Sequence, residues 1–172
     1  YRAPDALAGN PGHEMVGEIV DNGDTSLRAG DRVAVNIITG CGECAACRAG
    51  DRRFCAEQGY VFNGHAEYVA VPAVNCMPLP DDVPFDDGVL IGGDTLGVAY
   101  HALSKICLRP RDTVAVVGCG PVGLGFVRLL GFYGVRTIAA EISPYRRELA
   151  LRVGADRVID PSADGGMAAL GE

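Results

Sequence analysis

Apolar and polar residues alternate over several short segments in the first part of the chain. Residues 15–21, 32–38 and 65–72 show this alternation, which is typical of half-buried β-strands. Glycine, proline and aspartate are concentrated between them, in GDTSLRAGD (23–31) and PLPDDVPFDD (78–87), and such segments are expected to form turns. The pattern therefore predicts a mainly β region on the N-terminal side of the chain.

The pattern changes towards residue 108. From Asp94 to Cys107 apolar residues recur at intervals of three and four, which predicts a helix. Strands and helices are then predicted in alternation: strand 113–118, helix 121–134, strand 135–141, helix 144–154 and the start of a strand at 157–160. Such alternation indicates parallel βαβ units. We therefore expect an α/β fold in two domains, a β-rich domain over 1–107 and the first part of a doubly wound parallel sheet over 108–172.

Four cysteines lie within one short segment, CGECAACRAGDRRFC. Cys41, Cys44 and Cys47 form two CxxC steps that share the middle cysteine, and Cys55 follows. Thiolates at this spacing can surround one zinc ion at about 2.3 Å each, and four of them complete a tetrahedral site with no position left for substrate. The segment 41–55 is therefore predicted to be a structural zinc lobe.

Two alternatives for these cysteines are less favoured. Disulfides would need an oxidising compartment, and nothing in the sequence indicates one. An iron–sulfur cluster is suggested by the CxxCxxC run, but ferredoxin-type motifs place a fourth cysteine a few residues on and follow it with proline. Here seven residues separate Cys47 from Cys55, and Ala56 follows. The remaining cysteines are expected to be small core residues: Cys76, Cys107 and Cys119.

A glycine-rich motif follows the predicted strand 113–118 and opens the next helix. Its GxGxxG sequence consists of Gly118, Cys119, Gly120, Pro121, Val122 and Gly123. In a βαβ unit the first glycine permits the tight turn, the second lets the backbone approach a pyrophosphate, and the third lets helix and strand pack. The helix N-terminus then faces the phosphate charge. The motif predicts a dinucleotide site, and a glycine-rich turn without a ligand is the alternative.

An acidic residue at the end of the following strand supports a dinucleotide site. Glu141 is placed to accept hydrogen bonds from the two ribose hydroxyls of NAD and to repel the extra phosphate of NADP. Arg146 and Arg147 lie shortly beyond it, and arginine in this region can instead hold a 2′-phosphate. The position of Glu141 favours NAD, with NADP as the alternative.

Composition and charge narrow the class of protein. Charged residues make up 22% and hydrophobic residues 48% of the 172 residues, as in ordinary soluble proteins. The formal net charge of −7 disfavours nucleic acid or an anionic membrane as a partner, because no segregated basic face accompanies it. The first residues lack the pattern of a signal peptide and no apolar run approaches a membrane span, so we expect a cytoplasmic protein.

Several motifs, in their order along the chain, together resemble the zinc-containing medium-chain dehydrogenase/reductases, the group of alcohol, sorbitol and threonine dehydrogenases. They are PGHEMVGEIV (11–20), GDRVAV (30–35), the four-cysteine lobe, AEYVAVP (66–72) and GDTLGVAYHAL (93–103). The resemblance covers essentially the whole chain. It implies a GroES-like β-rich catalytic domain followed by a Rossmann domain.

The resemblance also implies a catalytic zinc site. His13 corresponds to the histidine ligand, and Glu14 to a family glutamate that lies near the metal and can replace a water ligand. Asp94 stands where alcohol dehydrogenases carry a cysteine ligand and where sorbitol and threonine dehydrogenases carry an acid. Its alternative role is to cap a helix that begins at Thr95. The other two histidines are expected to be structural: His65 and His101.

The activity implied by the resemblance is zinc-dependent hydride transfer between an alcohol or polyol and NAD. The resemblance also implies a small-molecule alcohol or carbonyl substrate and a homodimer or homotetramer. It implies that Arg146 covers the adenine and that Arg147 faces solvent. The chain begins after the family's first cysteine ligand and ends after about half of a Rossmann sheet, so we expect a fragment that is inactive alone. Two alternatives stay open: a medium-chain reductase relative with structural zinc only, and a non-catalytic binding module.

Overall fold

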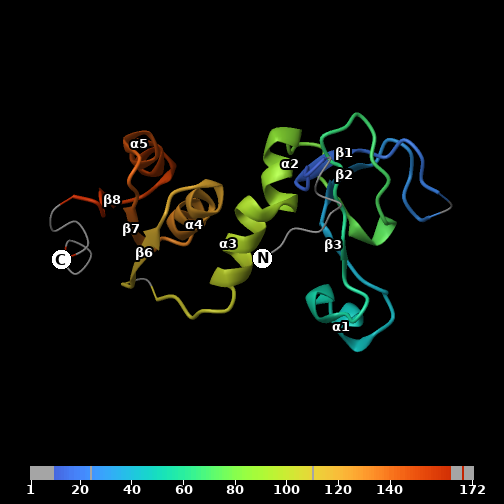
Figure 1. Ribbon diagram of the computed structural model, residues 1–172, viewed down its shortest axis with the longest axis horizontal. Helices are drawn as coiled ribbons and strands as arrows, with labels where there is room; N and C mark the ends of the chain where they lie inside the picture. The colour runs from blue at the N-terminus through green and yellow to red at the C-terminus, as the bar shows by residue number, and fades with distance from the viewer. Residues whose placement is uncertain (1–9, 24, 110, 164–167, 169–172) are drawn as a thin grey trace. The chain divides into compact units, whose positions relative to one another are not determined.

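The computed structural model describes residues 10–23, 25–109, 111–163 and 168, and the chain forms two compact units (Figure 1). Unit 1 is Tyr1–Gly93 and unit 2 is Asp94–Glu172. The division lies before helix α3 (Asp94–Leu103), whereas the sequence pattern predicted it after residue 107. The reason is packing within unit 2, because α3 lies against helix α4 (Pro121–Phe132).

Unit 1 is built around a three-stranded antiparallel sheet in the order β1-β2-β5. These strands are β1 (Met15–Glu18), β2 (Arg32–Val35) and β5 (Cys76–Pro78). Met15 of β1 pairs with Val35 of β2, and both side chains are buried together with Val61. The strands predicted over 15–21 and 32–38 are therefore confirmed in shorter form.

A second pair of strands forms the stem of the cysteine lobe. Strand β3 (Ile38–Thr39) pairs antiparallel with β4 (Gly59–Tyr60), and the cysteine segment is the connection between them. The lobe itself contains the one-turn helix α1 (Ala45–Arg48) and a short 3-10 helix, Arg52–Phe54. A second 3-10 helix, Ala73–Asn75, leads into β5.

The strand predicted over 65–72 is wrong. These residues form no regular strand and are mostly exposed. The main chain ahead of them is engaged with residues that precede β1: the Asn63 amide donates to the Asn10 carbonyl at 3.2 Å, and the Gly64 amide to the Gly12 carbonyl at 2.9 Å. An alternating pattern describes a surface that could pack in a sheet, but it does not supply the neighbouring strand.

Helix α2 (Phe85–Gly92) begins within a segment that the sequence pattern predicted as a turn. Two aspartates occupy its first turn, where negative charge is favourable. Arg32 holds the loop ahead of the helix, since its guanidinium donates to three carbonyls of residues 80–83 and lies 4.3 Å from the centroid of the Phe85 ring. The same prolines and aspartates that are typical of turns thus also start this helix.

Unit 2 contains a three-stranded parallel sheet in the order β6-β7-β8. The strands are β6 (Thr113–Val117), β7 (Arg136–Ala140) and β8 (Arg157–Ile159), and they are connected by α4 and by α5 (Pro144–Val153). The predicted alternation of strands and helices is confirmed, with most elements slightly shorter than predicted. None of the described helices has the length and apolar character that a membrane span requires.

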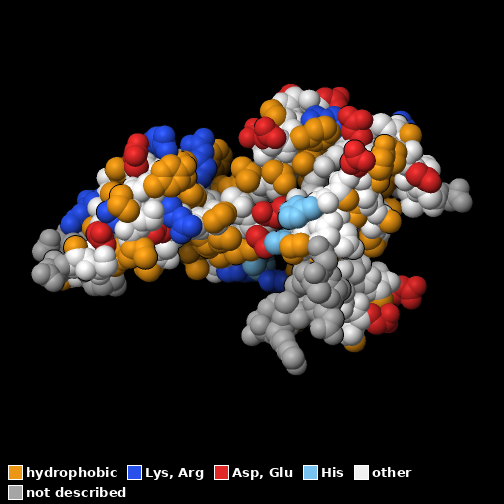
Figure 2. Space-filling model, turned by 45° about the horizontal axis from the view of Figure 1, so that its top comes forward, with side chains coloured by type: hydrophobic (Ala, Val, Ile, Leu, Met, Phe, Trp, Pro, Cys, Tyr) orange, Lys and Arg blue, Asp and Glu red, His pale blue; other side chains and the backbone are white. Residues whose placement is uncertain are grey.

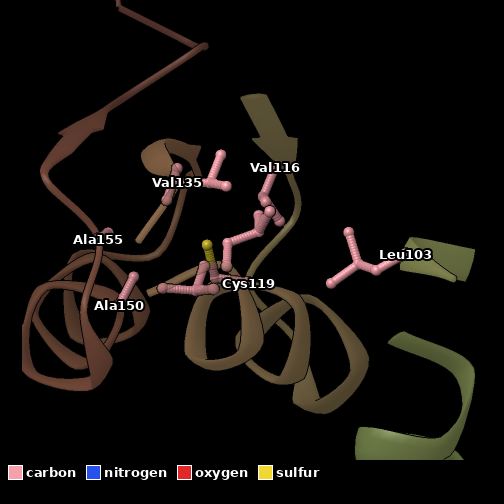
Figure 3. Packing of buried hydrophobic residues seen from close by; sticks show 9 residues of the cluster. Leu103, Val116, Cys119, Val135, Ala150 and Ala155 are labelled. Carbon is pink, nitrogen blue, oxygen red and sulfur yellow. The ribbon is translucent and has the colours of Figure 1, made fainter. Parts of the chain in front are cut away.

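The core of unit 2 lies between its helices and the sheet (Figure 3). Val116 of β6 and Ala150 of α5 are buried there together with Cys119, which is completely inaccessible. The prediction of a small core residue is therefore confirmed for Cys119. It is wrong for Cys107, which is exposed because α3 ends at Leu103.

Candidate functional site

The four lobe cysteines, Cys41, Cys44, Cys47 and Cys55, bring all their sulfurs within 4.8 Å of one another. Cys44 caps helix α1, and its Sγ accepts a hydrogen bond from the Cys47 amide at 3.4 Å. The Cys44 amide donates to Cys41 Sγ, and the Cys41 amide to Cys55 Sγ, both at 3.4 Å. Amide donors favour the thiolate form that a metal requires. The local backbone therefore gathers the four sulfurs around one point.

The cluster fits a zinc ion. Four sulfurs at about 2.3 Å from a tetrahedral zinc are about 3.8 Å apart, which agrees with the spread of the sulfurs in the lobe. The Gly42 amide lowers the pKa of Cys47, but desolvation and hydrogen bonds with the other three sulfurs outweigh it and raise this pKa to about 12. A divalent cation would reverse that effect, because it binds thiolates. All seven cysteines are free thiols, which gives no support to disulfides.

Two residues outside the motif hold the lobe in place. A Cβ on Gly40 would lie 2.8 Å from Cys47 Sγ, so only glycine allows the chain to pass the sulfurs here. Asn75 is completely buried, and its side-chain amide donates to the carbonyls of Asn36 and Ile38, the latter at 3.0 Å. Sequence reasoning missed Asn75, because its partners are distant in sequence. It missed Gly40 because the spacing of the cysteines does not mark the residue before them.

His13 lies in a loop that residues 63–65 hold in position. The Asn10 side chain donates to the His65 carbonyl and accepts from the His65 amide, each at 3.1 Å. A Cβ on Gly12 would lie 2.4 Å from the His65 nitrogen, so the residue before His13 must be glycine. These contacts of His65 involve its main chain.

The ring of His13 is oriented by its neighbours. Its Nδ1 lies 2.9 Å from the Pro11 carbonyl oxygen, and donation to that oxygen defines the tautomer in which Nε2 carries the lone pair. The ring also packs edge-on against Phe62, with centroids 6.3 Å apart. A backbone carbonyl behind the ring is the usual support of a metal-ligating histidine.

Glu14 and Asp94 belong to different units. In unit 1, Glu14 packs beside Gly93, where a Cβ would approach its Oε1 to 2.3 Å. In unit 2, Asp94 is the first residue of α3, and a carboxylate in a first helical turn interacts favourably with the helix dipole. The two roles predicted for Asp94, zinc ligand and helix cap, both stay predictions.

The glycine motif forms the turn between β6 and α4. Gly118 has a φ of +91°, which favours glycine, and its amide donates to the Ala140 carbonyl at 2.8 Å. A Cβ on Gly123 would lie 1.9 Å from the Gly118 carbonyl oxygen, whereas a Cβ on Gly120 would meet no atom within 4 Å. The third glycine is therefore needed for packing, and the second faces space that a ligand can enter. Pro121 and Val122 then begin α4.

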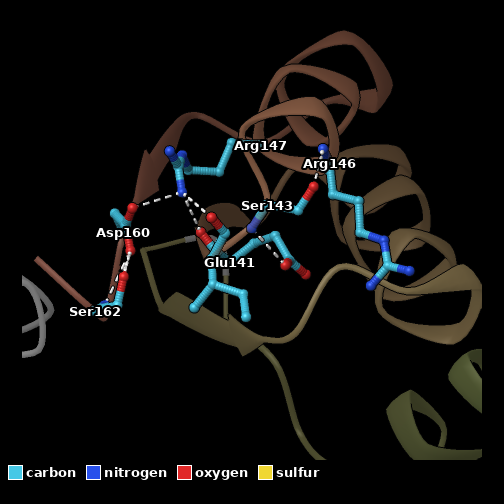
Figure 4. Close-up of polar contacts among 7 residues, drawn as sticks. Glu141, Ser143, Arg146, Arg147, Asp160 and Ser162 are labelled. Atoms are coloured by element: carbon cyan, nitrogen blue, oxygen red, sulfur yellow. Dashed lines mark hydrogen bonds and ion pairs between the residues drawn. The ribbon is translucent and has the colours of Figure 1, made fainter.

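Glu141 is buried beside this loop, directly after β7, with 5% of its surface exposed (Figure 4). Its Oε2 accepts from the Cys119 amide at 2.7 Å, and its Oε1 from the Ser143 amide at 2.9 Å. The Ser143 and Cys119 amides, together with the positive charge of Arg146, hold the pKa of Glu141 below its ordinary value. The carboxylate is therefore ionised, and it has lone pairs left over for further donors.

The two neighbouring arginines of α5 have different partners (Figure 4). Arg147 donates to the carbonyls of Glu141 and Ile142 and forms an ion pair with Asp160 at 2.9 Å. Its side chain is only 21% exposed, so the prediction that Arg147 faces solvent is wrong. The reason is the counter-charge that Asp160 supplies after β8. Arg146 is exposed, and its charge acts on Glu141.

Comparison with known proteins agrees with this description. The alcohol dehydrogenase GroES-like domain family matches residues 2–81. The chain is 39% identical over 157 residues to an L-threonine 3-dehydrogenase of Caldanaerobacter subterraneus subsp. tengcongensis, which covers 87% of this chain and 44% of that protein. It resembles an Escherichia coli CFT073 protein described as a short chain alcohol dehydrogenase and complexed with NADH, with TM-score 0.79, 33% identity and coverage of 94% and 51%. A candidate zinc-binding dehydrogenase of Sinorhizobium meliloti 1021 bound to NADP gives TM-score 0.79, 29% identity and coverage of 88% and 46%.

The fold and the matches define a zinc-type dehydrogenase architecture, a GroES-like unit followed by a Rossmann-type α/β unit. The chain is similar to zinc-containing dehydrogenases over most of its length, as its motifs predicted. It spans 44% of the length of the threonine dehydrogenase and 51% of the alcohol dehydrogenase chain, about half of each relative.

Proposed function

We propose that the whole protein is a zinc-dependent oxidoreductase that transfers a hydride between an alcohol or polyol and NAD. The observation that carries this proposal is the Glu141 carboxylate, which is buried and bonded to the Cys119 amide of the glycine loop at 2.7 Å. Burying an anion is costly without partners, and its remaining lone pairs suit the ribose hydroxyls of NAD. The similarity to threonine and alcohol dehydrogenases supports the same activity.

Each part of the proposed site has its own task. The ligands proposed for a catalytic zinc are His13, Glu14 and Asp94. Those proposed for a structural zinc are Cys41, Cys44, Cys47 and Cys55. The residues proposed to bind the dinucleotide are Gly118, Gly120, Pro121, Val122, Gly123, Glu141 and Arg146. When bound, zinc would act as a Lewis acid at the alcohol oxygen, and NAD would accept the hydride.

The donor types proposed for the catalytic site suit zinc. Imidazole nitrogen and carboxylate oxygen are both common zinc ligands. His13 is held by the Pro11 carbonyl at 2.9 Å in the tautomer that metal ligation through Nε2 requires. An oxygen ligand at Asp94 would donate less charge than a thiolate and leave the metal a stronger Lewis acid.

Counting zinc ions tests these assignments. Mass-spectrometric metal analysis of the whole protein should give two zinc ions per chain for the dehydrogenase, against one for a relative with structural zinc only. His13→Ala and Asp94→Ala should each remove one zinc and abolish turnover. His65→Ala is the matched control, because its contacts with Asn10 use main-chain atoms that alanine retains. Full zinc occupancy with turnover lost in Asp94→Ala would assign that residue to a helix cap or a substrate contact.

We propose NAD as the cofactor, and NADP is the competing candidate because similar structures carry NADH or NADP. The catalytic efficiency of the whole protein should be higher with NAD. Glu141→Ala should shrink this preference, because it removes both an acceptor for the ribose and a charge that repels phosphate. Both cofactors should be compared at equal ionic strength, since salt screens the repulsion. A wild-type preference for NADP would contradict the assignment.

The proposed partners are small alcohols or carbonyl compounds and further copies of the same chain. We propose a cytoplasmic dimer or tetramer that binds neither nucleic acid nor membranes, and the net charge of −7 supports the last point. Light scattering during size-exclusion chromatography measures the assembly. A monomer at micromolar concentration would contradict it.

A further inference from the structure

The side chain of Arg147 ties together the ends of two neighbouring strands (Figure 4). Its Nη1 donates to the carbonyls of Glu141 and Ile142, which follow β7, each at 2.8 Å. The same nitrogen lies 2.9 Å from Oδ2 of Asp160, which follows β8. Asp160 is fixed in turn, because its Oδ1 accepts from the amide and the hydroxyl of Ser162. We name Arg147, Asp160 and the two carbonyls the strand-end clamp.

Glu141 is therefore restrained at both its main chain and its side chain. Arg147 holds its carbonyl, while its carboxylate accepts from the Cys119 amide at 2.7 Å and from the Ser143 amide at 2.9 Å. Figure 4 shows the carboxylate turned toward Ser143, whereas Arg147 turns toward Asp160. The direction of this carboxylate thus depends on a backbone that the clamp holds.

We infer that the strand-end clamp sets the preference for a ribose 2′-hydroxyl over a 2′-phosphate, with Arg147 acting as a positioning residue for Glu141 and not as a ligand of the cofactor. The inference rests on the proposed dinucleotide site. A carboxylate discriminates between the two riboses only where its lone pairs meet the 2′-position. Without the clamp, the peptide between Glu141 and Ile142 can rotate and redirect the carboxylate.

A direct role for Arg147 makes the opposite prediction. An arginine beyond this strand can bind a 2′-phosphate, and its removal would then weaken binding of the phosphorylated ribose alone. The preference for the 2′-hydroxyl would rise. Removal of a clamp weakens binding of the unphosphorylated ribose, so the preference falls. The direction of the change therefore separates the two roles.

Isothermal titration calorimetry of the whole protein with ADP-ribose and 2′-phospho-ADP-ribose measures this preference. Arg147→Met keeps a long apolar side chain but removes every donor. Its affinity for ADP-ribose should fall about tenfold, the effect of losing one hydrogen bond to a charged group, with a smaller change for the phosphorylated compound. Arg147→Lys keeps the charge without the fork of donors and should recover part of the preference.

Arg152→Met is the matched control, because Arg152 is an exposed residue of the same helix and the change removes the same charge. It should leave the preference unchanged. Asp160→Asn should shift the preference in the same direction as Arg147→Met by a smaller factor, and adding it to Arg147→Met should have no further effect. This variant also tests the clamp if Arg147→Met does not fold.

An unchanged or increased preference in Arg147→Met, or in Asp160→Asn if that variant alone folds, overturns the inference. A wild-type whole protein that binds neither compound has a different meaning. It refutes the proposed dinucleotide site, and the clamp loses its role with it.

Discussion

Alanine at Gly125 should destabilise unit 2, whereas alanine at Gly131 of the same helix should stabilise it. Gly125 is buried where α4 meets α3, and an added Cβ would lie 2.0 Å from the Thr95 carbonyl oxygen. Ordinary contacts of a Cβ begin at 3.4 Å, so the two helices would have to separate by more than 1 Å. The obstacle is backbone, and no side-chain rotation can relieve it.

Two opposing contributions determine the size of the effect. Alanine in place of glycine inside a helix stabilises by about 1 kcal/mol, and overpacking of a core destabilises by about 1–3 kcal/mol. The rigid obstacle puts Gly125→Ala at the upper end, for a net loss of about 1–2 kcal/mol. Gly131→Ala keeps the gain of about 1 kcal/mol, because its Cβ would meet only the Gly154 carbonyl oxygen at 3.8 Å. The two variants should therefore differ by about 2–3 kcal/mol.

Urea unfolding followed by circular dichroism at the helical band measures both variants. With equal slopes, the transition midpoints report the difference in stability directly. The midpoint of Gly125→Ala should lie below that of the wild type, and the midpoint of Gly131→Ala above it. If the two variants are equally stable, the close approach of α3 and α4 is refuted.

Other sites give outcomes of different kinds. Cys47→Ser should lower the zinc content and increase protease cleavage within the lobe while ADP-ribose affinity stays the same, and unchanged zinc with an intact lobe would exclude the four-thiolate site. Gly123→Ala should abolish ADP-ribose binding in calorimetry, because its Cβ would lie 1.9 Å from the Gly118 carbonyl oxygen; normal affinity would contradict this geometry. Hydrogen bonds lower the pKa values of Glu141 and Asp160. The two ionised carboxylates therefore stabilise the fold at pH values above the ordinary pKa of a carboxyl group, and this stabilisation is lost as pH falls through the lowered pKa values. Urea midpoints should therefore fall more steeply with acidification in the wild type than in Glu141→Gln, and equal slopes would refute this contribution.

Local patterns were sufficient to predict the elements of unit 2. The apolar run of β6, the glycine motif and the start of α4 follow one another directly, so the turn between them depends on neighbouring residues only. The cysteine lobe was predictable for a similar reason, because α1 and the N–H donors around the sulfurs lie within the same short segment. In both cases the residues that form the site lie close together in the sequence.

Long-range partners explain what the sequence pattern missed. Residues 65–72 alternate like a strand, yet the main chain just ahead of them bonds to Asn10 and Gly12, far away in sequence. Helix α2 follows a loop that is held by Arg32 of strand β2, a residue far away in sequence. Neither contact leaves a periodic signal, because a single side chain or a few amides make it.

The two arginines of α5 show how a local motif can leave specificity undecided. Successive residues on a helix point about 100° apart, so Arg146 and Arg147 leave α5 in different directions. Which one turns away depends on strand register: Ala140 pairs with Ile159, and the residues that follow them, Glu141 and Asp160, therefore end their strands side by side. One guanidinium can then reach a carbonyl of the first and the carboxylate of the second. A relative with the same motif but without an acid directly after β8 should lack the strand-end clamp, and its second arginine should then be able to compete for a 2′-phosphate.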